Sequence, residues 1–181
     1  GGTGTITNPG TGASVLRPCL TGLTGDITNL ASCGNAIASS EYYSGTAKEN
    51  AFDGNVGTPG TNSGAPCWEP DAGTVATAEW IGWDFDPGEA GYYATVSQAK
   101  FQQFHNQTNR TDIWDTVNVE ASQDLLTWVP IAVFAACTHP ADNTAGIVES
   151  VTFTAYNARA FRLRPTEVTR FTSAALLVQC A

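Results

Sequence analysis

The chain has 181 residues, with eight Lys and Arg against 17 Asp and Glu, so its formal net charge is −9. That length can bury one core, and the acidic balance excludes nucleic acid and argues against an anionic membrane as partners. No apolar run reaches the 18 residues needed to cross a bilayer. The sequence contains no Met. We therefore expect that a leader or pro-segment has been removed and that the protein is extracellular, either secreted or surface-exposed.

Residues 1–30 are predicted to form an N-terminal arm. This segment is rich in Gly and Thr and has only scattered apolar positions, so it cannot form a core of its own. It is either a flexible linker or a segment ordered by packing on its own domain or on a neighbouring subunit. Residues 31–181 are expected to form the folded domain.

A cluster of turn-forming residues follows over residues 51–58. It reads Ala-Phe-Asp-Gly-Asn, with Thr58 three residues later. Asp, Gly and Asn favour tightly turned backbone, in which carbonyl groups can converge beside a carboxylate. Such a group of oxygens suits a hard cation, and a plain β-turn is the alternative.

Four later runs alternate between apolar and polar residues, as strands with one buried face do. Asp86-Pro87-Gly88 and Ser122-Gln123-Asp124 end two of these runs as turns. No sustained helical period occurs, so the pattern predicts an antiparallel sandwich or barrel. The alternating runs are residues 81–85, 117–121, 151–155 and 161–164.

Aromatic and basic residues near these runs are assigned by their position. Trp68 lies between Pro66 and Pro70 in an irregular segment, so we expect its ring to be exposed. Arg162 and Arg164 alternate with the buried face and are predicted to be solvated or paired with carboxylates. Core rings are predicted for the tryptophans in or next to strands, which are Trp80, Trp83, Trp114 and Trp128.

Five segments, in this order, resemble the discoidin family, which includes the C-type domains of coagulation factors V and VIII and the family 32 carbohydrate-binding modules. The resemblance covers residues 33–181. It implies an all-β fold, a galactose-binding-like jelly-roll β-sandwich of antiparallel strands. The segments are residues 38–42, 47–58, 79–85, 120–128 and 158–164.

The five cysteines have no Cys-x-x-Cys spacing, so disulfides are expected rather than a zinc site. The odd count leaves one thiol free or paired with another chain. The resemblance implies a disulfide between Cys33 and Cys180, which bracket the domain. Cys67 with Cys137 is a second predicted pair. Cys19 in the arm is then the odd thiol, with Cys67, Cys137 or another chain within its reach.

The resemblance also implies a structural calcium ion, held through Asp53, Asn55 and Thr58. Family members that bind calcium usually add a Glu from the last strand, where this chain has Ala175 or Leu177. One strong carboxylate ligand is therefore missing, and weak calcium binding and no calcium binding both remain as alternatives.

Sugar binding is implied at loops on one end of the sandwich. Arg and Asn side chains can bond to neighbouring hydroxyl groups, while an aromatic ring covers the apolar face of a pyranose. The first candidates are His105, Asn109 and Arg110, with a ring from Tyr42, Tyr43 or Trp68. Two glycosylation sequons, at Asn106 and Asn109, overlap the same loop. A glycan there would block a small sugar pocket.

Signs of catalysis are absent from the sequence. His139 precedes Pro140 with no nucleophile signature near it, and Asp84 and Asp86 flank a turn. We therefore predict a non-catalytic extracellular module that binds glycans or glycoproteins. The alternative is a structural or adhesive subunit of an extracellular or viral assembly, in which the arm contacts other copies or another subunit.

Overall fold

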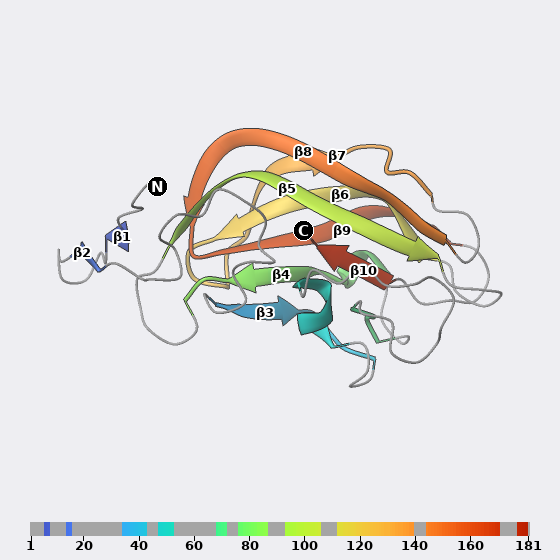
Figure 1. Cartoon of the computed structure of the whole chain (residues 1–181), viewed down its shortest axis with the longest axis horizontal. Coiled ribbons are helices and arrows are strands. Elements are labelled where there is room, and N and C mark those ends of the chain that lie inside the picture. The colour runs from blue at the N-terminus through green and yellow to red at the C-terminus, as the bar shows by residue number, and fades with distance from the viewer. Residues whose placement is uncertain are drawn as a thin grey trace.

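A computed structural model shows a flattened β-sandwich (Figure 1). No helix among its described residues is long and apolar enough to span a membrane. The structure describes residues 6–7, 14–15, 34–42, 47–52, 68–71, 76–86, 93–105, 112–139, 144–170 and 177–180.

Two antiparallel sheets form the sandwich. The larger has the strand order β3-β4-β9-β6-β7 and the smaller β10-β5-β8. The strands of both sheets are β3 (Asn35–Ala38), β4 (Ile81–Asp84), β5 (Ala94–His105), β6 (Asp112–Ser122), β7 (Val129–Phe134), β8 (Thr144–Ala158), β9 (Ala160–Arg170) and β10 (Leu177–Cys180). The predicted all-β sandwich is confirmed, and the four alternating runs lie in β4, β6, β8 and β9.

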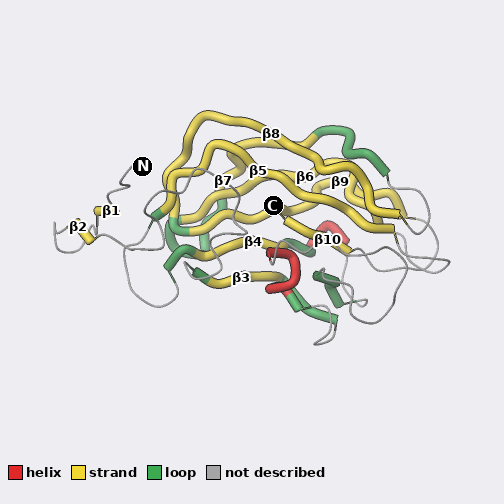
Figure 2. The backbone as a smooth tube through the Cα atoms, in the orientation of Figure 1, coloured by secondary structure: helices red, strands yellow, loops and turns green. Residues whose placement is uncertain are grey.

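Helical structure among the described residues is limited to two short 3₁₀ turns, η4 (Lys48–Phe52) and η5 (Ala76–Ala78) (Figure 2). In the predicted arm, β1 (Ile6–Thr7) pairs with β2 (Ser14–Val15). One long connection, which contains η4 and η5, joins β3 to β4, although these strands are direct neighbours in the sheet.

The core between the sheets is aromatic. The ring of Phe101 from the smaller sheet meets those of Trp114 and Phe134 from the larger sheet, with centroids 5.9 and 4.9 Å away. Gln103, also on β5, both donates to and accepts from the backbone of Trp114 at 3.0 and 2.8 Å. The amide thus ties the two sheets together inside the core, where an unpaired polar group would be costly.

The outer side of the larger sheet carries a stacked cation. The guanidinium of Arg162 lies 4.2 Å from the ring centroid of Trp128 and 5.0 Å from that of Trp80. Arg162 and Arg164 both bond to the buried carboxylate of Glu120. The predicted pairing of these arginines with a carboxylate is confirmed. Trp83 and Trp114 are core residues as predicted, whereas Trp80 and Trp128 are half-buried beside Arg162.

Candidate functional site

One end of the sandwich collects the connections between strands. Because neighbouring strands are antiparallel, β3, β5, β7 and β9 finish at the same end at which β4, β6, β8 and β10 begin. We call it the loop end; it is the right-hand end in Figure 1. It is where the family resemblance places sugar binding.

A hydrogen-bond network fixes the chain as it leaves β3 at the loop end. One carboxylate oxygen of Glu79, which is 2% exposed, accepts from the hydroxyl groups of Ser39 and Ser40, the latter at 2.8 Å. Ser40 also accepts from the indole N–H of Trp68 at 2.8 Å and from the backbone N–H of Asp71 at 2.9 Å. Three stretches far apart in the sequence are thereby held together.

Tyr42 projects from this fixed segment. Its backbone N–H donates to the carbonyl oxygen of Glu69 at 3.0 Å, and the residue is 48% exposed. Beside it, Lys48 donates to the carboxylate of Glu41 from its backbone at 2.9 Å and from Nζ at 3.0 Å. The backbone bond from Lys48 is the main reason that the pKa of Glu41 lies below its usual value. An exposed ring on an ordered backbone suits stacking on a sugar.

Trp68 is not exposed, and that prediction is wrong. Its exposed fraction is 0%, and its ring packs on Trp114 with 6.4 Å between centroids. The flanking prolines indicate an irregular backbone, but an irregular segment can still turn its side chain into the core. Trp68 therefore packs in the core beneath the loop-end segment that it bonds to, and its ring is not accessible to a ligand.

The opposite side of the loop end carries a His–Asp pair that the sequence did not reveal. His139, which is exposed, bonds through Nε2 to a carboxylate oxygen of Asp115. The backbone N–H of Cys137 donates to the carbonyl oxygen of Asp115 at 2.8 Å, and that of Thr138 to the Glu149 carboxylate at 2.7 Å. These bonds hold the His139 segment against β6 and β8. The paired residues are 24 positions apart in the sequence, so no local motif predicts the pair.

Cys137 is a buried free thiol, so the predicted disulfide between Cys67 and Cys137 is not formed in the structure. Burial, together with the charges of Glu149 and Asp115, raises the pKa of this thiol to about 12. It is therefore uncharged at neutral pH and is no nucleophile. Three partners in the predicted disulfides lie outside the described part, namely Cys33, Cys67 and the side chain of Cys180.

The two sides of the loop end are well separated. Tyr42 follows β3 and His139 follows β7, which are the two edge strands of the larger sheet. Four strand spacings amount to about 19 Å, so one sugar ring cannot contact both residues.

The first-choice sugar residues belong to the connection from β5 to β6. The backbone of His105 ends β5 opposite Thr144 of β8, which places this connection at the loop end. Several predicted sugar contacts lie outside the described residues, and so do both sequons. These contacts are the side chain of His105, Asn109, Arg110 and Tyr43.

The residue that precedes the predicted calcium ligands is held by packing in the core. Phe52, the last residue of η4, is buried and packs against the ring of Trp83 with 5.0 Å between centroids. Asp53, Asn55 and Thr58 lie outside the described residues. Within the part of the chain that the structure describes, no three His, Cys, Asp or Glu side chains are grouped to hold a metal.

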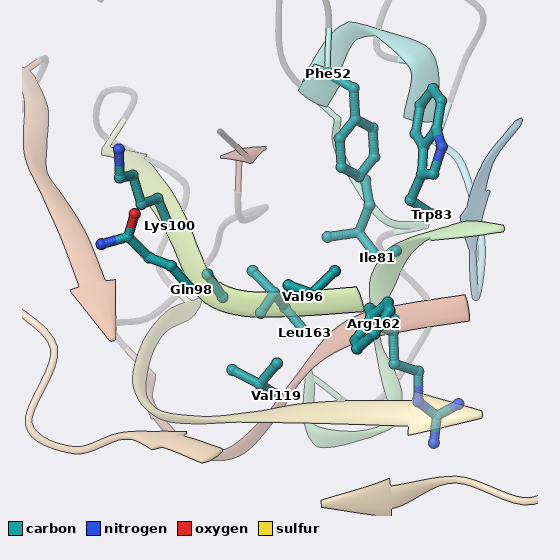
Figure 3. Close-up of a pocket in the computed structure, with 12 residues that line it drawn as sticks. Phe52, Ile81, Trp83, Val96, Gln98, Lys100, Val119, Arg162 and Leu163 are labelled. Atoms are coloured by element: carbon teal, nitrogen blue, oxygen red, sulfur yellow. The ribbon is translucent and has the colours of Figure 1, made fainter. Parts of the chain in front are cut away.

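A partly open cavity of about 60 Å³ lies between the two sheets (Figure 3). Apolar side chains surround most of it, while Arg162 turns its guanidinium away from it. A sugar needs converging polar groups, whereas the polar lining residues Gln98 and Lys100 lie on one side of the cavity and Arg162 on the other (Figure 3). The cavity is therefore not a candidate sugar site. Its main apolar lining residues are Phe52, Ile81, Trp83, Val96, Val119 and Leu163.

The fold has known counterparts. A chitosan-binding module of a Paenibacillus chitosanase/glucanase, solved with chitotriose, aligns with a TM-score of 0.56 and 17% identity over 82% of this chain and 95% of the module. The chain has the discoidin fold. Discoidin II of Dictyostelium discoideum aligns with a TM-score of 0.55 and 12% identity, over 86% of this chain and 58% of its own.

A CBM32 module of Clostridium perfringens, solved with GalNAc-β-1,3-galactose, aligns with a TM-score of 0.53 and 17% identity. The match covers 82% of this chain and 96% of that module. No protein-family model and no curated protein matches the sequence. At such identities the likeness establishes the discoidin fold, and function has to be argued from the loop end.

Proposed function

We propose that this protein is a non-catalytic carbohydrate-binding module that holds its ligand at the loop end. The observation that carries the proposal is a loop end with an exposed, backbone-anchored Tyr42 on one side and the His139–Asp115 pair on the other, in a discoidin fold. Structures with this fold include modules solved with chitotriose and with GalNAc-β-1,3-galactose. The neutral thiol of Cys137 supports a role without covalent catalysis.

The primary sugar contacts in this proposal are His105, Asn109 and Arg110. Asp115 is the fourth residue of β6, so the His139–Asp115 pair lies close to where the β5–β6 connection returns to the sheet. Both nitrogen and oxygen groups are thus available there for sugar hydroxyls. Tyr42 lies across the loop end and is reached by a longer oligosaccharide that extends from the primary position.

The ligand is proposed to be neutral or cationic. With a formal net charge of −9, the protein repels sulfated and uronic-acid glycans at long range. Amino sugars and uncharged sugars meet no such barrier. We place the protein outside the cell, where such glycans are displayed. Calcium, if it is bound, has the structural role that the resemblance implies for Asp53, Asn55 and Thr58.

A glycan array run with and without a chelator tests this function, followed by calorimetry with chitotriose and GalNAc-β-1,3-galactose. We expect binding to at least one neutral or amino glycan. Arg110→Ala should weaken it at least tenfold, which corresponds to about 1.4 kcal/mol. Gln98→Ala, at an exposed position in the middle of β5, is the matched control and should bind as the wild type does. Absence of binding to every glycan on the array would contradict the proposal.

A further inference from the structure

Strand β8 forms one edge of the smaller sheet. It pairs with β5 on one side, and the other side has no strand next to it among the described residues. β8 is 15 residues long, and Glu149 is its single charged residue. In Figure 1 it forms the upper margin of the sandwich. A long edge strand presents unpaired N–H and C=O groups to any strand that meets it.

Apolar side chains gather beside this edge. Of the six large hydrophobic residues that are exposed in the described part of the chain, four lie on β7 and β8. These two edge strands contact each other across the sandwich. Ile147 and Val148 on β8 are 59% and 52% exposed, and Val129 and Val133 on β7 are 45% and 47% exposed.

Several defences of a natural edge strand are missing from the middle of β8, although Glu149, opposite the buried Phe101, is an inward-facing charge that holds the backbone of Thr138. Natural edges are blunted by Lys, Pro, bulges or a short length. Val148–Thr152 contains neither Lys nor Pro and faces Gln98–Gln102 of β5 without a register shift, and the irregularities lie outside this stretch. Val148–Thr152 is therefore a regular stretch with no strand paired on its outer side among the described residues.

The charge of this stretch favours a second copy of the chain as the partner. Lys100 faces Ser150 across the sheet, and Glu149 faces Phe101. The paired segments of β5 and β8 thus carry one positive and one negative residue, although the whole chain has a net charge of −9. Two copies can meet here without the like-charge repulsion that other faces of the molecule would cause.

We propose that two copies of this protein pair antiparallel along Val148–Thr152, around a twofold axis at Ser150, to form a continuous six-stranded sheet. Val148 then lies opposite Thr152 of the partner subunit, and Glu149 lies opposite Val151 of the partner subunit. Ser150 lies opposite Ser150 of the partner subunit. No two like charges face each other, and the arrangement is self-complementary, as a twofold interface must be.

Sedimentation equilibrium of the full chain tests this pairing. The wild type should have twice the monomer mass of 19.0 kDa. Ser150→Glu and Ser150→Lys each place like charges opposite each other across the axis, so each variant alone should be a monomer. Lys100 of the same chain faces this position, so it weakens the repulsion in Ser150→Glu and adds to it in Ser150→Lys. An equimolar mixture of the two variants should restore the dimer, because the charges then become complementary.

Two controls keep the result interpretable. Thr166→Glu introduces a charge at an exposed position of β9 in the other sheet and should remain a dimer. Circular dichroism of the Ser150 variants should match that of the wild type, since among the described residues the Ser150 side chain makes one bond, an exposed 3.2 Å bond with Gln98. A monomeric wild type, dimers that survive both Ser150 variants, or a mixture that stays monomeric would each overturn the proposal. Surviving dimers would point to the arm or another face.

Discussion

Glu120 shows at the residue scale how the larger sheet stabilises charge on its outer side. Its side chain is 3% exposed, and its two oxygens accept from Arg162 at 2.7 Å and from Arg164 at 2.9 Å. The stacking of Arg162 over the neighbouring rings of Trp80 and Trp128 fixes one of these donors. A buried carboxylate is tolerated only with partners of this kind.

Removing the charge of Glu120 should be costly. Glu120→Gln leaves two arginines without their carboxylate, and we expect the free energy of unfolding to fall by about 3 kcal/mol at neutral pH. Glu167→Gln, at an exposed residue of the same sheet that accepts from Thr116 at 2.8 Å, should change it by less than about 0.5 kcal/mol. Urea denaturation of both variants measures the difference. Equal losses in the two variants would show that the buried ion pairs of Glu120 do not stabilise the fold more than an exposed carboxylate does.

The same carboxylate predicts a pH dependence of stability. Burial raises the pKa of Glu120, but the bonds and charges of Arg164 and Arg162 outweigh burial, and the net pKa lies below its ordinary value of 4.5. Because the folded pKa is the lower one, this group's contribution is full above 4.5 and is lost as the pH falls through the folded pKa. Urea denaturation across the acid range should therefore show a shallower loss of stability in Glu120→Gln than in the wild type. Parallel curves would contradict this assignment.

Chemical labelling of Cys137 tests whether it is a buried free thiol or is disulfide-bonded to Cys67. With a pKa of about 12 and little exposure, its thiol should resist iodoacetamide in the native protein at pH 8 and react fully in urea. Mass spectrometry of the peptide that contains Cys137 reads out both states. Rapid labelling of the native protein, or a peptide disulfide-linked to Cys67, would show that the thiol is not the buried free group described above.

At the scale of elements, the irregular pairing of β5 leaves the sandwich incompletely filled. A register shift occurs between Val96 and Gln98, and the cavity lies beside Val96 and Ala99 (Figure 3). Gly82 also lines the cavity but cannot be enlarged, because a Cβ there would lie 2.2 Å from the carbonyl oxygen of Phe161. Ala99 is therefore the position from which the cavity can be filled.

Ala99→Val should stabilise the domain. Two added methyl groups enter the apolar cavity of about 60 Å³, and the free energy of unfolding should rise by about 1 kcal/mol. Ala155→Val, on an exposed position of β8, adds the same groups to the surface and should have little effect. Thermal unfolding of the two variants compares them. A loss of stability in Ala99→Val would show that the cavity is closed to larger side chains.

The register shift in β5 also explains why alternation in the sequence predicted four strands and missed this one. β4, β6, β8 and β9 alternate apolar and polar residues in the sequence, although all four residues of β4 are buried in the structure. In β5 the step from Val96 to Phe101 breaks the period of two at the register shift. β7 begins Val129-Pro130 and lacks clear alternation, which an edge strand tolerates.

The site was predictable only in part, for a related physical reason. Tyr42 is one of the predicted aromatic residues and is exposed, but the burial of Trp68 and the pairing of His139 with Asp115 depend on contacts between distant segments. No local pattern in the sequence encodes such contacts. The family resemblance predicted that sugar binds at one end of the sandwich, and the strand topology shows which segments lie at that end.

At the scale of the whole molecule, the loop end and the β8 edge have separate roles. Antiparallel pairing along β8 would direct the two loop ends away from each other, so a dimer would present two glycan sites on opposite sides. Such a dimer bridges two glycan-bearing surfaces, and the avidity gained in this way is lost in a monomer. Ser150→Glu should therefore reduce binding to a glycan-coated surface while leaving the affinity for free chitotriose unchanged, as surface plasmon resonance and calorimetry would show.

The proposed function depends on carbohydrate binding at the loop end. The most direct measurement is a titration of the ¹⁵N-labelled full chain with chitotriose and with GalNAc-β-1,3-galactose, followed by amide chemical shifts. We expect saturable shifts at the loop end, at His105–Arg110 and His139 and, with the longer ligand, at Tyr42. Shifts confined to the opposite end or to the face of the smaller sheet, or no shifts with either sugar, would contradict the proposed function.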